Sequence, residues 1–142
     1  MGRQIVTPLL LDTCAAIWLA EDEPVYEAAA AAIDRAARDG VPIFVSAMSA
    51  WEIGLLNARG RLVMSMSPEA WFEALLAVPG IVLADISVKI LIASSFLPGT
   101  PPRDPADRII AATAREHGYQ LVTRDGLLLD YAAEGHIQAL AC

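Results

Sequence analysis

The sequence predicts an α/β fold, in which helices cover both faces of a mostly parallel sheet. Short apolar segments alternate along the chain with longer segments of helical character, which is the order that parallel strands and their crossover helices require. The first segment is apolar throughout, as is typical of a strand buried on both faces. Several expected helices begin at a capping residue or end at a glycine.

The expected strands are short runs of apolar or β-branched residues. The clearest is Leu9–Leu11, where three leucines stand together and a charged residue follows directly. The other strands are expected at 42–45, 81–84 and 120–123, with a last short one at 137–140.

The expected helices are recognised by their ends. Ser67-Pro68 and Asp104-Pro105 each place a capping residue before a proline, which favours the first turn of a helix. Gly40, Gly60 and Gly118 follow expected helices, because glycine adopts the left-handed backbone of a helix C-terminus without strain. In chain order, the helices are expected at 13–20, 25–38, from Ser46 or Ser49 to about 59, 67–78, 87–96 and 104–117, with a proline-rich loop at 97–102.

The composition indicates a folded protein with a substantial core. The chain has 142 residues, of which 56% are apolar and 19% are charged, so we expect a single domain spanning 1–142. No apolar run approaches the roughly 18 residues of a membrane span, and the segment from Arg3 to Leu11 is too short for a signal peptide. Cys14 and Cys142 form no disulfide framework, so a cytoplasmic location is expected.

The net charge of −7 argues at first sight against a nucleic-acid substrate, because nucleic-acid binders are usually basic. Bound cations would reverse the local field, so the charge does not decide the substrate. Several arginines lie close in sequence to acidic residues, and they could hold phosphates or merely balance the charge of those acids. They are Arg59, Arg61, Arg103, Arg108 and Arg124.

Five acidic residues occupy positions where a sequence usually has an apolar residue. An isolated carboxylate in apolar surroundings is costly unless it is paired or binds a metal, and no basic residue is regularly spaced to pair with each of them. We therefore predict that they meet around divalent cations. They are Asp12 after the first strand, Glu52 within a helix, Asp104 and Asp107 at the start of another helix, and Asp125 after the strand at 120–123.

Each acid also has a purely structural interpretation. Asp12 and Asp125 lie at the carboxyl edge of the sheet, where ligands bind, but either could simply cap the helix that follows. Asp107 shares a helical stripe with apolar residues at i+3, i+4 and i+7, which places it on the inward side, yet it could instead stabilise the helix dipole. Asp104 is a candidate cap, and Glu52 could close a capping box with Ser49.

The ordered set of motifs resembles the PIN domain, and within it the VapC-type toxins of prokaryotic toxin–antitoxin pairs. The resemblance covers essentially the full chain. The matching pieces are Leu9-Leu10-Leu11-Asp12-Thr13, the segment from Ser46 to Gly54 with Trp51-Glu52-Ile53, Gly60-Arg61-Leu62, Asp104-Pro105-Ala106-Asp107-Arg108 with the helix that follows, and Leu121-Val122-Thr123-Arg124-Asp125.

The resemblance implies a three-layer α/β/α fold and an endoribonuclease that hydrolyses RNA phosphodiesters by metal-activated water, with Mg²⁺ or Mn²⁺ as the cofactor. It places metal-binding and catalytic acids at Asp12, Glu52, Asp107 and Asp125. Thr123 becomes a supporting polar residue, and Asp104 matches an acid found in only some relatives. The expected partners are an RNA substrate, a cognate antitoxin protein and a second copy of the chain, with no membrane. Two alternatives remain: an inactive PIN fold that only binds RNA or a partner, and an Asp-based phosphatase-like α/β enzyme.

Overall fold

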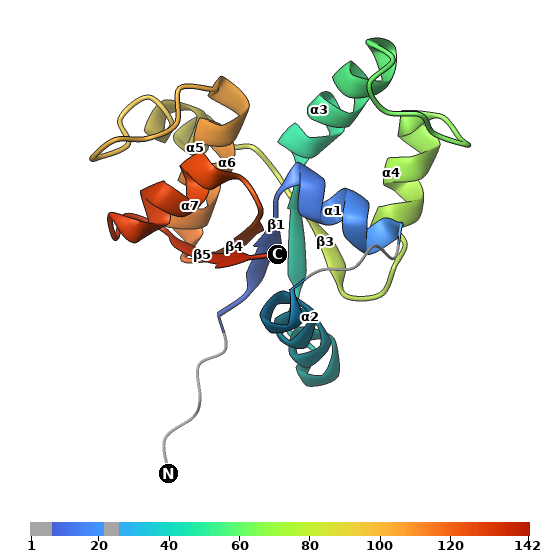
Figure 1. The fold of residues 1–142 in the computed structure, drawn as a ribbon, viewed down its shortest axis with the longest axis horizontal. Helices are drawn as coiled ribbons and strands as arrows, with labels where there is room; N and C mark the ends of the chain where they lie inside the picture. The colour runs from blue at the N-terminus through green and yellow to red at the C-terminus, as the bar shows by residue number, and fades with distance from the viewer. Residues whose placement is uncertain (1–6, 22–25) are drawn as a thin grey trace.

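The structure, a computed structural model, describes residues 7–21 and 26–142. Its centre is one five-stranded sheet in the order β3-β2-β1-β4-β5 (Figure 1). Every neighbouring pair of strands is parallel, which confirms the predicted parallel sheet. The strands are β1 Leu9–Leu11, β2 Ile43–Ser46, β3 Ile81–Ala84, β4 Gln120–Thr123 and β5 Gln138–Ala141.

Strand β1 is the most deeply buried of the five because strands flank it on both sides and helices cover both of its faces. Leu10 aligns with Phe44 of β2 on one side and with Leu121 of β4 on the other. Leu10 and Leu11 have no exposed surface, and Leu9 is nearly as buried. This burial accounts for a strand that is apolar at every position rather than at alternate ones.

The helices form a layer on each face of the sheet, giving the three-layer α/β/α architecture (Figure 1). One core joins α1, α2, α3 and α4 to Leu9, Leu11 and Val45 of the sheet. The opposite core joins α6 and α7 to Leu10 and Leu121, and α5 packs on α6 through Ile90. The helices are α1 Thr13–Ala20, α2 Glu27–Asp39, α3 Ala47–Ala58, α4 Pro68–Leu76, α5 Val88–Ala93, α6 Pro105–His117 and α7 Gly126–Ala133.

All six predicted helices are present, and the differences lie at their ends. Helix α3 begins after Ser46, whose hydroxyl accepts a hydrogen bond from the amide of Met48, so Ser46 rather than Ser49 is the cap. Helix α4 ends at Leu76 and α5 ends at Ala93, each before the predicted end. The Ser94 hydroxyl donates to the carbonyl of Leu91 in the last turn of α5, which satisfies one of the carbonyls that a helix C-terminus leaves open.

Helix α7 was not among the predicted elements, and β5 lies one residue later than predicted. The predicted helix start at Val25 and the N-terminal segment containing Arg3 and Ile5 lie outside the described residues. Within the described part of the chain, no helix combines the length and apolarity that crossing a membrane requires.

Candidate active site

The order of the strands creates a natural binding position beside β1. The chain leaves β1 toward β2 on one side and later returns to place β4 on the other side. Such a reversal opens a crevice at the carboxyl ends of the two strands, which is where ligands bind in open α/β sheets. Asp12 follows β1 directly and Asp125 follows β4 after one residue, so both predicted acids lie at this edge.

Asp12 is buried, with 6% of its surface exposed, and it does two structural tasks at once. Its Oδ1 accepts a hydrogen bond from the amide of Ala15 at 2.7 Å, so it caps α1. Its Oδ2 accepts a hydrogen bond from the Thr123 hydroxyl at 2.5 Å, which ties β1 to β4. Burial raises the pKa of Asp12, and the bonds from Thr123 and Ala15 partly offset that rise.

Thr123 couples two of the acids through its side-chain hydroxyl. Besides donating to Asp12, its hydroxyl oxygen accepts a hydrogen bond from the amide of Asp125 at 3.0 Å. Asp125 in turn caps α7, since its Oδ2 accepts from the amide of Leu128 at 3.0 Å. The cap interpretation is therefore correct for Asp12 and Asp125, and it coexists with their position at the sheet edge.

Glu52 reaches the site from α3 and does not form the capping box that its spacing with Ser49 allowed. Because α3 starts at Ala47, both residues lie inside the helix rather than at its cap. The Glu52 Oε1 accepts a hydrogen bond from the Thr13 hydroxyl at 2.6 Å, and the Ser49 hydroxyl lies 2.9 Å from the same Thr13 oxygen. Thr13 directly follows Asp12 in the chain, so its bond to Glu52 ties the Glu52 carboxylate to the end of β1.

The sequence indicates no role for Thr13 and favours Ser49 only as a helix cap or as the capping-box partner of Glu52. Both side chains are buried, and they connect α1 to α3. The signal for Thr13 was its position directly after the acid at the end of the first strand.

Asp104 and Asp107 enter from α6. Asp104 is the N-cap: its Oδ1 accepts from the amides of Ala106 at 2.8 Å and Asp107 at 3.2 Å. Asp107 lies in the first turn of the helix and is half-buried, with Ile110, Ala111 and Ala114 of its predicted stripe fully buried. No hydrogen bond to the Asp107 carboxylate occurs within the described residues.

Neighbouring acids raise the pKa of Glu52 and of Asp107, which places the acids of the four segments within electrostatic reach of one another. Burial is the largest cause in each case. The pKa of Asp107 rises to about 7, with further contributions from the charges of Asp104, Asp125, Glu52 and Asp12. Burial likewise raises the pKa of Glu52, although the bond from Thr13 opposes the rise. Four separate segments thus meet in one negatively charged site.

Basic side chains form no ion pair with these acids within the described residues, although the charge of Arg124 lowers the pKa of Asp12. The two ion pairs found among residues 7–21 and 26–142 are Lys89 with Glu116 and His136 with Glu134, which leaves all five acids without an ion-pair partner there. Hard carboxylate oxygens with uncompensated charge suit Mg²⁺ or Mn²⁺. In the described ranges, however, no three acidic, histidine or cysteine side chains are yet close enough to hold an ion together. Threonine hydroxyls and helix amides hold Asp12, Glu52 and Asp125 individually.

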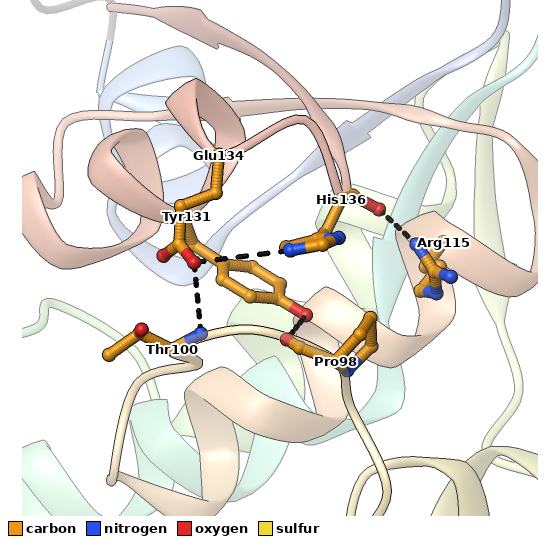
Figure 2. A network of polar contacts seen from close by, with 6 residues as sticks. All are labelled: Pro98, Thr100, Arg115, Tyr131, Glu134 and His136. Carbon is orange, nitrogen blue, oxygen red and sulfur yellow. Dashed lines mark hydrogen bonds and ion pairs between the residues drawn. The ribbon is translucent and has the colours of Figure 1, made fainter.

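A network of polar contacts holds the loop that leads into Asp104 (Figure 2). From α7, the Tyr131 hydroxyl donates to the carbonyl of Pro98 at 2.7 Å. The Glu134 Oε1 accepts from the amide of Thr100 at 3.0 Å and lies 3.9 Å from Nε2 of His136. From the other side, Arg108 of α6 donates to the carbonyls of Ser94 and Pro102. The loop is therefore fixed on two sides before it delivers the α6 acids.

Gly99 lies at the closest approach within this network. Its φ of +70° is in the left-handed region, and a Cβ atom there would come within 2.4 Å of Nε2 of His136. The left-handed backbone therefore favours glycine, and a side chain there would also displace the ends of the His136 and Glu134 side chains.

Comparison with known families identifies this architecture. The chain matches the PIN domain family over residues 9–134, which includes all five acids and both threonines of the site. The chain belongs to the PIN domain family. The three-layer architecture described above is thus the PIN fold.

A relative of known type agrees with this assignment. Ribonuclease VapC22 of Mycobacterium tuberculosis (strain ATCC 25618 / H37Rv) is 34% identical over 121 residues, covering 84% of this PIN domain chain and 88% of the relative.

Two solved structures share the fold. VapBC2 from Rickettsia felis, bound to a DNA fragment from its promoter, aligns with a TM-score of 0.67 at 13% identity, covering 95% of this chain and 98% of that one. DNA-bound VapBC from Salmonella typhimurium aligns with a TM-score of 0.64 at 19% identity, with the same coverage of both chains.

Proposed function

We propose that the chain is a metal-dependent endoribonuclease and the toxin component of a type II toxin–antitoxin system. One observation carries the proposal: acids from four separate segments meet at the switch point of a PIN-fold sheet, with no ion-pair partner among residues 7–21 and 26–142. The 34% identity to a ribonuclease of the VapC group supports the same activity. An acidic site of this kind attracts divalent cations rather than the RNA phosphates themselves, so the cations must mediate substrate binding.

In this proposal Asp12, Glu52, Asp107 and Asp125 hold Mg²⁺ or Mn²⁺. Bound ions would activate water and stabilise the charge that develops as the phosphodiester breaks. Thr123 and Thr13 keep the Asp12 and Glu52 carboxylates in position through their hydroxyl donors. In the described residues these carboxylates are near one another but not close enough to hold an ion together. Binding of an ion between them would offset the repulsion among their charges.

Asp104 has a lesser part in the proposal. One of its oxygens is committed to the cap of α6, and the residue is exposed. We assign it to fixing the first turn of α6, and thereby the direction in which Asp107 points.

The activity is tested by incubating RNA with the purified protein and Mg²⁺ or Mn²⁺, with and without EDTA. The wild type should cleave only when the metal is available, and Asp12→Asn and Glu52→Gln should each lose cleavage while remaining folded by circular dichroism. Asp34→Asn, on the exposed side of α2, is a matched control that removes one acid elsewhere. Equal cleavage by wild type and Asp12→Asn would disprove the mechanism.

The same experiment separates the two alternatives. A PIN fold that only binds RNA would retain RNA without cutting it under any metal condition. A phosphatase-like enzyme would release phosphate from a small phosphomonoester and leave RNA intact. The acids have no ion-pair partner in the part of the chain that the structure describes, which favours the nuclease because a metal would then offset their charge.

We further propose that the partners are a cognate antitoxin protein and a second copy of the chain, with the toxin acting in the cytoplasm. The likeness to VapBC assemblies supports an antitoxin. An apolar cavity of about 450 Å³ between α1, α2 and α4, whose lining includes Leu19, Ile33 and Trp71, offers room for an apolar segment of it.

Exposed apolar side chains on and after α5 support the second copy. Val88 is 73% exposed and Phe96 is 80% exposed, and Leu91 and Ile92 lie between them with large exposed surfaces. Burial of such a patch between two copies would be favourable. Light scattering at micromolar concentration should give the mass of a dimer, and a monomer mass there would count against this part of the proposal.

A further inference from the structure

Arg124 occupies an unusual position at the edge of the acidic site. It stands between Thr123 and Asp125 at the carboxyl end of β4. Its guanidinium carbon lies 3.6 Å from the ring centroid of Trp18 in α1, and its Nε donates to the main-chain carbonyl of Cys142 at 2.8 Å. The side chain is nevertheless exposed. The guanidinium is therefore held in one place while remaining open to solvent.

Arg124 does not pair with the neighbouring acids. An arginine beside several carboxylates would ordinarily form a bidentate ion pair with one of them. Neither ion pair found in the described part of the chain includes Arg124, although the next residue is an acid of the site. Stacking on Trp18 and the bond to Cys142 hold the guanidinium apart from the acids, so that Nη1 and Nη2 have no protein hydrogen-bond partner among the described residues.

Arg108 shows the contrast with a structural arginine. Its Nε and Nη1 both donate to main-chain carbonyls, and these bonds fix the loop before α6. Arg124 uses only Nε in this way. Its two terminal nitrogens, whose spacing matches the oxygens of a phosphate, remain available to a ligand.

We infer that Arg124 binds a backbone phosphate of the RNA strand beside the phosphodiester that is cut. The inference rests on the proposed nuclease function and names the residue through which the acidic chain holds its substrate next to the metal site. Two terminal N–H groups can contact one phosphate in parallel, and a guanidinium already fixed by Trp18 loses little freedom on binding. Trp18 is thus a positioning residue, which acts through Arg124.

RNA affinity and its salt dependence test the inference in an Asp12→Asn background, which prevents cleavage. The probe is a short fluorescein-labelled single-stranded RNA of mixed sequence, followed by fluorescence anisotropy over a series of salt concentrations. Arg124→Ala should weaken binding on the order of tenfold, the loss expected for a charge-assisted hydrogen bond. It should also reduce the slope of log affinity against log salt by about 0.7, the value for one phosphate contact on a single strand.

Three further variants separate a phosphate contact from a structural role. Arg35→Ala removes the same charge from the exposed face of α2, which lies at the opposite end of the sheet from α3 (Figure 1), and should leave the slope unchanged. Arg124→Lys keeps the charge but loses the paired donors, so it should keep the slope and part of the affinity. Trp18→Leu should lower the affinity and keep the slope.

An Arg124→Ala slope equal to that of Arg35→Ala overturns the inference, as does the absence of RNA binding by every variant. If wild-type protein cleaves RNA but the slope does not depend on Arg124, the inference fails and the proposed function stands. If the slope depends on Arg124 but the wild type never cleaves with Mg²⁺ or Mn²⁺, the proposed function fails and Arg124 remains a phosphate-binding residue.

Discussion

Replacing Asp107 with asparagine should stabilise the metal-free protein at neutral and higher pH. The pKa of this carboxyl rises from 3.8 to about 7, first because it is partly buried and then because four other acids face it. The folded state therefore binds a proton more tightly than the unfolded state does. The stability that this proton provides is complete below pH 3.8 and is lost as the pH rises to about 7.

The magnitude follows from the two pKa values. At about 1.4 kcal/mol per pH unit between them, the upper limit is about 4 kcal/mol. Asp107 is only half-buried, so water screens much of the repulsion, and we expect about 1–2 kcal/mol. For a chain of this length, that gain corresponds to roughly 3–7 °C in the midpoint of thermal unfolding.

The assay is thermal unfolding by circular dichroism in EDTA at several pH values. Asp107→Asn should match the wild type at low pH and exceed its midpoint at pH values above about 7. Asp34→Asn, an exposed acid on α2, is the matched control and should shift little at any pH. If Asp107→Asn gives no gain at high pH, or a gain that does not depend on pH, then the acids do not repel one another as we infer.

Three further results are expected. Addition of Mg²⁺ or Mn²⁺ in place of EDTA should raise the unfolding midpoint of the wild type and leave that of Asp12→Asn nearly unchanged. The reason is that a ligand stabilises only the state that binds it. Equal shifts in both proteins would contradict the proposed metal site. Thr123→Val should cost about 1–3 kcal/mol of unfolding free energy, measured in urea, because it leaves the buried Asp12 oxygen and an amide without a partner, whereas Thr7→Val at the partly exposed start of the described chain should cost little. Gly99→Ala should cost about 1–3 kcal/mol and expose the loop before α6 to limited proteolysis, because its left-handed backbone and the nearby His136 leave no room for a methyl group; proteolysis at the wild-type rate would contradict the close packing of that loop.

The layers and most elements of the fold were predictable because the signals were local and mutually consistent. The run Leu9–Leu11 can hardly be anything but a buried strand, and Asp104-Pro105 followed by an apolar stripe and Gly118 defines α6 from end to end. Helix α7 escaped prediction because its first residue, Gly126, is a poor helix former and the three leucines after it show no helical period. Its start is set instead by the side chain of Asp125.

The site was predictable as a set of acids but not as an arrangement. The apolar neighbours of Asp107 indicated correctly that it lies on the inward side of α6. The partner of Glu52 was not predictable, because Thr13 is 39 residues away in the sequence and only the packing of α1 against α3 brings them together. For the same reason nothing local showed that Arg124 would stack on Trp18 instead of pairing with an acid.

The position of Asp125 along the chain has a consequence for protein synthesis. Strand β4 completes the pairing with β1, and it leaves the ribosome after the other four acids. Since chains fold from the N-terminus as they emerge, a ribosome-bound fragment holding Asp12, Glu52, Asp104 and Asp107 still lacks the last carboxylate and the threonine that anchors the first. Under the proposed function, a nascent chain would therefore stay inactive toward the RNA around it until β4 and Asp125 have been translated.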